Sequence, residues 1–187
     1  MIRATLLSLT LALTAPLPAA AQGVPDQTSA KRMLFATRNA QLLIVRQPFL
    51  SEADLATLRE MPKVAQLKYY GAMAANPAEG LQSESTRGAF NFHSVEEARA
   101  AALRACGPGC VVVAEVRPRG YQDGRPLTLS QDASRTVAGR DFGRAGTNAA
   151  LAISPSTGAW ALGDGAQAAV AACAAKGAGD CKTAVGR

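Results

Sequence analysis

Two stretches of the sequence, residues 69–116 and residues 147–185, resemble each other, and this internal repeat limits the possible folds more than any other feature. Each stretch contains the pattern Ala-x-Ala-x-(Asn or Ser)-Pro-x-x-Gly, at residues 72–80 and 150–158. An Ala-rich run that ends in Cys, a Gly-rich turn, a second Cys and an apolar run follow in both copies. Since a repeated sequence unit indicates a repeated structural unit, we expect the two copies to fold alike.

The first copy carries the clearer secondary-structure signals. Small residues alternate over 69–75, which predicts a strand, and residues 88–92 predict a strand that returns beside it. Ser94 begins the pattern Ser-x-x-Glu, a capping box, and predicts a helix that ends at Cys106. The apolar, β-branched run 111–116 predicts a buried strand. The unit therefore has the predicted order strand, strand, helix, strand.

The second copy is shorter than the first. Residues 81–87 have no counterpart in it, so we expect them to form a loop inserted in a hairpin. Asp164 followed by Gln167 predicts the cap of its helix, which reaches Cys173. The sequence predicts an α+β fold in which the two repeats form a largely antiparallel sheet with helices on one face, held by disulfides.

The chain divides into five segments: 1–21 signal peptide, 22–68 N-terminal extension, 69–116 first repeat, 117–145 Arg-rich connection and 146–187 second repeat. Residues 22–30 are polar and predicted to be a loose tail. Ser51 predicts the cap of a short helix in the extension, and Ser130 predicts another in the connection. The length of 22–187 fits one domain.

The first residues have the organisation of a secretory signal peptide. Arg3 supplies a positive charge, residues 4–15 are apolar, and the Ala-x-Ala site at 19–21 suits cleavage after Ala21. No Cys follows this site, so we expect no lipid anchor, and no later stretch suits a membrane span. We therefore expect a bacterial protein that is periplasmic or secreted, in a compartment that permits disulfides.

Four cysteines allow three pairings. The repeat favours Cys106 with Cys110 and Cys173 with Cys181, because each pair then closes the turn between a helix and a strand. A zinc site and a redox-active pair are the alternatives. Both normally use Cys-x-x-Cys, whereas the gaps here are three and seven residues.

The sequence contains one histidine, His93, directly before a predicted helix cap. His93 could belong to a triad or a metal site, or it could be a hydrogen-bonded neighbour of the cap. No Gly-x-Ser-x-Gly or His-Glu-x-x-His motif occurs. Capping explains Glu97, and Glu115 faces either a strand edge, which we favour, or a polar site. We therefore predict no catalytic, cofactor-binding or metal-binding residue.

The chain is moderately basic, with 20 Lys and Arg against 14 Asp and Glu and a formal net charge of +6. This excess fits a solvated basic surface or attraction to anionic envelope polymers or phospholipid headgroups. No Lys or Arg run exceeds two residues, and no aromatic residues are interleaved with them, so we expect no nucleic acid partner.

We expect a ligand site, if one exists, at the seam between the two copies. Phe90 and Trp160 follow Gly-Ala in their copies and are predicted to occupy matching places. Tyr70 is expected to lie near these two aromatic residues. Arg117 or Arg119 could supply contacts to an anion. Aromatic residues with a cationic rim suit an anionic or sugar-like ligand. In the competing interpretation both aromatic residues belong to a dry core.

Residues 70–74 (Tyr-Gly-Ala-Met-Ala), residues 154–160 (Ser-Pro-Ser-Thr-Gly-Ala-Trp) and the helix-Cys-turn-Cys-strand endings carry a family resemblance. On these motifs the chain resembles small secreted bacterial proteins known as the domain of unknown function 4189, over most of 69–185. A single unit is often the whole domain in that family, so the chain is expected to hold two diverged copies. The family has no established activity, and the resemblance implies no catalytic residue.

Similar proteins that share stretches like 91–94 and 113–120 sometimes carry the name 5-aminolevulinate synthase. Such an enzyme needs a Schiff-base lysine, a phosphate cradle and a partner for the pyridine nitrogen. The sequence has no Gly-rich phosphate loop after a strand, and export would separate the protein from acyl-CoA substrates. The residues do not support that activity.

Three functions follow as hypotheses. The first is a non-catalytic periplasmic module that binds an envelope polymer or a partner protein. The second is an inhibitor of a secreted hydrolase that presents the turn at residues 107–109. The third is an enzyme of unrecognised type.

Overall fold

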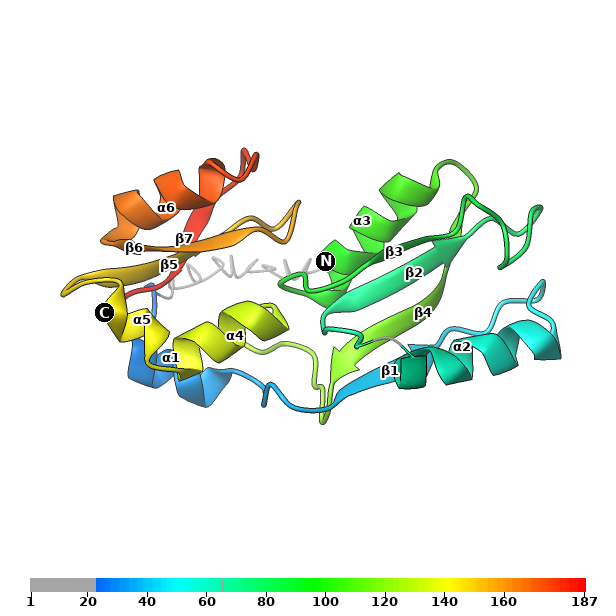
Figure 1. The fold of residues 1–187 in the computed structure, drawn as a ribbon, viewed down its shortest axis with the longest axis horizontal. Helices are drawn as coiled ribbons and strands as arrows, with labels where there is room; N and C mark the ends of the chain where they lie inside the picture. The colour runs from blue at the N-terminus through cyan, green and yellow to red at the C-terminus, as the bar shows by residue number, and fades with distance from the viewer. Residues whose placement is uncertain (1–22, 65) are drawn as a thin grey trace, which may run out of the picture.

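Six helices and seven strands occur in the computed structural model, which describes residues 23–64 and 66–187 (Figure 1). In chain order they are α1 (Gln27–Met33), β1 (Ala40–Ile44), α2 (Glu52–Val64), β2 (Gly71–Ala75), β3 (Arg87–Ala89), α3 (Val95–Cys106), β4 (Val111–Pro118), α4 (Gln131–Ala138), α5 (Asp141–Arg144), β5 (Ala149–Ile153), β6 (Trp160–Asp164), α6 (Ala166–Ala174) and β7 (Lys182–Val185). The signal peptide predicted for 1–21 lies outside the described residues. Among the helices that the structure describes, none is long and apolar enough to cross a membrane.

The strands form two antiparallel sheets, one in each repeat. The first sheet has the order β1-β4-β2-β3 and the second has the order β6-β5-β7. In both sheets the first strand of the repeat, β2 or β5, lies between the second and third strands of that repeat. The predicted α+β class and the strand-strand-helix-strand order are confirmed, with the difference that each repeat forms a sheet of its own.

The two sheets share a β-bulge at the same place. The pairing of β2 with β4 shifts between Met73 and Ala74, and the pairing of β5 with β7 shifts between Leu151 and Ala152. These residue pairs occupy the same positions in the repeated Ala-x-Ala pattern. A bulge bends and twists the strand that contains it, so both sheets receive the same local distortion.

Both copies also turn alike after their first strand. The N–H of Gly80 donates to the carbonyl oxygen of Asn76, and the N–H of Gly158 donates to that of Ser154, each at 2.9 Å. The φ angles of the two glycines are 85° and 74°, in the left-handed region where a side chain is strained. This turn explains the glycine in the repeated pattern.

Phe90 and Trp160 do not occupy matching places, so that prediction is wrong. Trp160 is the first residue of β6 and pairs with Ile153, whereas Phe90 follows Ala89, the last residue of β3. The two aromatic residues therefore lie at opposite ends of equivalent strands. The seven inserted residues at 81–87 offset the Gly-Ala-aromatic motif from the strand register.

One helix of each repeat covers one face of its sheet, α3 on the first and α6 on the second (Figure 1). The contacts consist largely of alanine, and Ala72, Ala98 and Ala102 have no exposed surface. In the second repeat, a Cβ atom placed on Gly163 would lie 2.2 Å from the backbone nitrogen of Ala169. Small residues thus let the helices approach their sheets closely.

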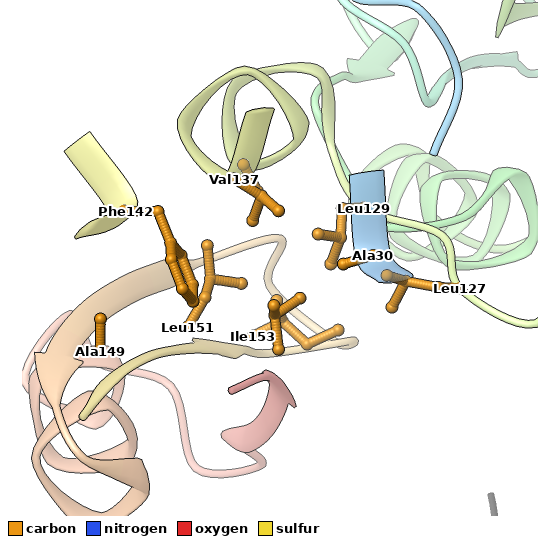
Figure 2. Packing of buried hydrophobic residues seen from close by; sticks show 10 residues of the cluster. Ala30, Leu127, Leu129, Val137, Phe142, Ala149, Leu151 and Ile153 are labelled. Carbon is orange, nitrogen blue, oxygen red and sulfur yellow. The ribbon is translucent and has the colours of Figure 1, made fainter. Parts of the chain in front are cut away.

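The connection between the repeats covers the other face of the second sheet (Figure 2). Val137 of α4, Phe142 of α5 and Ala30 of α1 pack against Leu151 of β5, and all four side chains are fully buried. All five residues of β5 are buried because helices lie on both faces of the sheet. The Arg-rich connection therefore contributes to the core of the second repeat.

The other face of the first sheet, which includes β1, packs against α2. Leu58 of α2 is fully buried in a cluster with Val113 and Ala75. Leu81, the first inserted residue, joins this cluster and is 7% exposed. The insertion contains turns, as predicted, but its first residue is anchored in the core.

The helix caps agree with the sequence at three places and differ at two. The hydroxyl oxygens of Ser51, Ser94 and Ser130 accept backbone N–H groups three residues later, as predicted. The loose tail predicted for 22–30 is wrong from Asp26 onwards, because α1 begins at Gln27 after the cap residue Asp26, and residue 22 lies outside the described residues. Asp164 is not a cap, since α6 begins after Gly165 and the Asp164 carboxylate accepts the N–H of Asn148 at 3.0 Å.

Both predicted disulfides are confirmed. Cys106 is bonded to Cys110 and Cys173 to Cys181. Each disulfide joins the end of a repeat's helix, α3 or α6, to the residue before its last strand. No cysteine of the described residues is free.

Candidate functional site

A cavity of about 690 Å³ lies where the two repeats meet the connection and the N-terminal segment. The residues that line it come from α3 and the segment before it, from β5 and β7, from the connection before α4, and from the start of the chain. They are Gly23, Val24, Pro25, Met33, His93, Glu97, Pro126, Leu127, Thr128, Ile153, Lys182, Thr183 and Ala184. This size suits a small organic ligand, for which protein pockets measure roughly 300–1,000 Å³.

His93 lines this cavity and forms hydrogen bonds with two other segments of the chain. Its Nδ1 accepts the backbone N–H of Ser130 at 3.2 Å, and its Nε2–H donates to the carbonyl oxygen of Ala159 at 3.1 Å. Because Nδ1 accepts a hydrogen bond, the imidazole is neutral with its proton on Nε2. Burial is the main reason that the pKa of His93 falls to about 4. Both ring nitrogens are engaged, so His93 connects the first repeat, the connection and the second repeat.

Glu97 lines the cavity, and one of its carboxylate oxygens has no hydrogen-bond partner among the described residues. This oxygen, Oε2, is buried. Burial raises the pKa of Glu97, while hydrogen bonding to Ser94 and the charge of Lys182 oppose this effect. A buried polar atom without a partner is uncommon in folded proteins and calls for a compensating interaction.

Lys182 brings a positive charge to the same cavity from the second repeat. It is the first residue of β7, pairs with Ile153 in the sheet and is exposed. No ion pair between Lys182 and Glu97 occurs in the described structure, although the ammonium lowers the pKa of the carboxyl. The cavity therefore has one carboxyl and one ammonium group in its lining, and the two form no ion pair in the described structure.

Two threonines and one histidine complete the polar lining of the cavity. The hydroxyl groups of Thr128 and Thr183 line the cavity, but no described residue forms a hydrogen bond that would activate either as a nucleophile. His93, the one imidazole, already uses both nitrogens. Over the described part of the chain, no group of three or more His, Cys, Asp or Glu residues is placed to hold a metal ion.

The residues predicted for a ligand seam lie elsewhere, and none of them lines this cavity. Tyr70 is buried against Tyr69 and Phe90 in the core of the first repeat, where burial raises its pKa. Trp160 packs into the core of the second repeat, with the Lys176 ammonium 5.2 Å from its ring centroid. The structure thus brings Tyr70 and Phe90 together but leaves Trp160 apart.

Arg117 and Arg119 also differ from each other in environment. Arg119 is exposed. Arg117 forms an ion pair with Glu115 at 2.6 Å and lies over the Tyr121 ring at 4.8 Å from its centroid. Arg117 thus packs within the first repeat.

The strand-edge interpretation of Glu115 is wrong. β4 lies between β1 and β2, and Glu115 is 2% exposed. Its carboxylate pairs with both Arg99 of α3 and Arg117 of β4. Sequence reasoning missed Arg99 because the contact depends on how α3 lies across the sheet.

Sequence reasoning also missed Glu97 and Lys182 as cavity residues. Glu97 matched a capping box, which already explained the residue, so no position in a cavity was considered for it. Lys182 stood next to Cys181 without a motif. Their common environment arises only when α3 of one repeat meets β7 of the other, which no local pattern encodes.

No family model matches the chain, and neither a curated protein nor a solved structure matches it. The resemblance to the domain of unknown function 4189 remains a prediction.

Proposed function

We propose that the protein is an exported, non-catalytic binding protein that holds a small polar ligand in the cavity between its repeats. The unpaired Oε2 of Glu97 is the observation that carries this proposal. An unsatisfied buried polar atom costs roughly 1–3 kcal/mol, and a ligand that donates a hydrogen bond would recover that free energy. The two disulfides fit the oxidising compartment to which the predicted signal peptide would deliver the chain.

A thermal-shift screen of the oxidised protein tests this proposal. The panel contains amines, amino acids, short peptides, sugars and carboxylates, and each is measured on wild type, Glu97→Gln and Glu96→Gln. Glu96 is the matched control, because it is the exposed neighbour of Glu97 on α3 and does not line the cavity. We expect at least one class to raise the Tm of wild type and Glu96→Gln but not of Glu97→Gln. A panel that shifts no variant, or that shifts all three equally, contradicts the proposal.

The inhibitor hypothesis concerns a different part of the surface. Pro108 lies exposed in the turn that the Cys106–Cys110 disulfide closes. Stoichiometric recovery of one hydrolase by wild type, but not by Pro108→Ala, would favour that function over the cavity.

A further inference from the structure

The Glu97 carboxyl and the Lys182 ammonium belong to cavity-lining residues of different repeats. Glu97 lies in the first turn of α3, and Lys182 begins β7. Among the described residues, no hydrogen bond or ion pair engages the Lys182 ammonium. A ligand with a single charge would satisfy one of these groups and leave the other unpaired.

The rest of the cavity wall is mostly apolar. Its apolar members are Val24, Pro25, Met33, Pro126, Leu127, Ile153 and Ala184. Ile153 is 6% exposed and Leu127 is 9% exposed, so these two side chains belong to the packed core, whereas Val24 is 51% exposed. An apolar portion of a ligand would lose contact with water against this wall.

We propose that the cavity binds a small zwitterion of about dipeptide size, with its ammonium on Glu97, its carboxylate on Lys182 and its apolar portion against the apolar part of the wall. This inference rests on the proposed function and adds the class of ligand. A zwitterion pairs with both charges at once, and charge-assisted hydrogen bonds are stronger than neutral ones. The volume of about 690 Å³ leaves room for more than a single small amino acid.

Isothermal titration of three related probes tests the assignment of each end. The probes are the dipeptide Leu-Leu, its N-acetyl derivative, which lacks the ammonium, and its C-terminal amide, which lacks the carboxylate. We expect Leu-Leu to bind about tenfold or more tightly than either derivative, since each derivative loses one charge-assisted contact.

Variants then link each end of the probe to one residue. Glu97→Gln should weaken Leu-Leu about tenfold but leave the affinity for the N-acetyl derivative unchanged, because that derivative has no ammonium to lose. Lys182→Gln should weaken Leu-Leu similarly and leave the affinity for the amide unchanged. Glu96→Gln and Lys31→Gln remove exposed charges outside the cavity and should bind all three probes as wild type does.

Negative results would distinguish failure of the zwitterion assignment from failure of the proposed function. Equal affinities for the three probes, or a loss in the variants that does not depend on the probe, would overturn the zwitterion assignment. If Leu-Leu does not bind while another class in the thermal-shift screen still depends on Glu97, the zwitterion inference fails and the proposed function stands. If no class depends on Glu97, both fail.

Discussion

The imidazole of His93 donates its Nε2–H to the carbonyl oxygen of Ala159 at 3.1 Å, and this hydrogen bond joins the first repeat to the hairpin turn of the second. The same ring accepts the N–H of Ser130, the cap residue of α4, at 3.2 Å. His93 is 1% exposed. The relative position of the repeats, and hence the cavity between them, therefore depends on a neutral imidazole.

We predict that acidification weakens the fold through His93. Its pKa is about 4 in the folded protein against 6.5 in the unfolded chain, so the unfolded chain takes up the proton first as the pH falls. The contribution is fully present above pH 6.5, declines between pH 6.5 and pH 4, and declines no further below pH 4. The total loss is about 3 kcal/mol. Urea unfolding at a series of pH values measures it.

The control is His93→Gln, which keeps a hydrogen-bonding side chain but does not titrate. The difference in unfolding free energy between wild type and this variant should shrink as the pH falls through the same range. A difference that stays constant from pH 7 to pH 4 would show that His93 does not govern the acid sensitivity.

Removal of the disulfides should destabilise the two repeats unequally. The chain-entropy model gives about 2 kcal/mol for Cys106–Cys110 and about 2.5 kcal/mol for Cys173–Cys181, because the second disulfide closes the longer loop. Paired Cys→Ala variants and urea unfolding test these values, with non-reducing peptide mapping to verify the remaining disulfide. A larger loss for the Cys106–Cys110 pair would contradict the loop-length explanation.

The sequence predicted those features that depend on local or repeated patterns. The Ser94 capping box placed the start of α3, and the duplicated Cys positions paired Cys106 with Cys110 and Cys173 with Cys181. The repeat supplied the topology because each copy supported the interpretation of the other. These predictions needed no knowledge of which surfaces meet.

Local sequence patterns could not predict the cavity, because its residues come together only when the two repeats pack against each other. Glu97 and Lys182 are 85 positions apart and share no motif. Phe90 and Trp160 shared a motif but not a register position, since the insertion before β3 shifted one of them. α1 was missed because its stability comes from Ala30, buried against the second sheet, rather than from a long amphipathic pattern.

Gly163→Ala should strongly destabilise the second repeat. The added Cβ would lie 2.2 Å from the nitrogen of Ala169 and 2.5 Å from the carbonyl carbon of Ala168. Both are backbone atoms, so α6 would have to move away from the sheet, at a cost of about 3 kcal/mol. Gly179→Ala is the matched control, because a Cβ there meets no atom within 4 Å. Equal unfolding free energies for the two variants would contradict the close packing of α6.

Glu115→Gln should destabilise the first repeat by about 2–3 kcal/mol. The change leaves the guanidinium groups of Arg99 and Arg117 without their common carboxylate. Removal of one partner from a fully buried ion pair costs roughly 3–5 kcal/mol, and we expect less here because both arginines are partly exposed. Chemical unfolding measures the loss, with Glu84→Gln on the exposed insertion as the reference. A loss no greater than that of Glu84→Gln would show that the ion pairs contribute little.

Glu97→Gln should have the opposite effect and stabilise the ligand-free protein at neutral pH. Burial raises the pKa of Glu97 in the folded state, so the folded state pays a penalty when the carboxyl ionises. A neutral amide avoids that penalty, so we expect the variant to have a higher unfolding free energy than wild type at pH 7. The sign of the pH dependence follows from the raised pKa. Wild type should recover the difference as the pH falls towards 4.5, the ordinary value of the group, because its carboxyl then becomes neutral as well.

Unfolding free energies of wild type, Glu97→Gln and Glu96→Gln at pH 7 and pH 4.5 test this last prediction. Glu96→Gln removes an exposed charge from the same turn of α3 and should change stability little at either pH. If Glu97→Gln destabilises the protein at pH 7, then the carboxylate contributes more as a helix cap than its burial costs. In that case its Oε2 would not be a group that the fold keeps at a cost in stability, and the main structural reason to expect a ligand at this position would be lost.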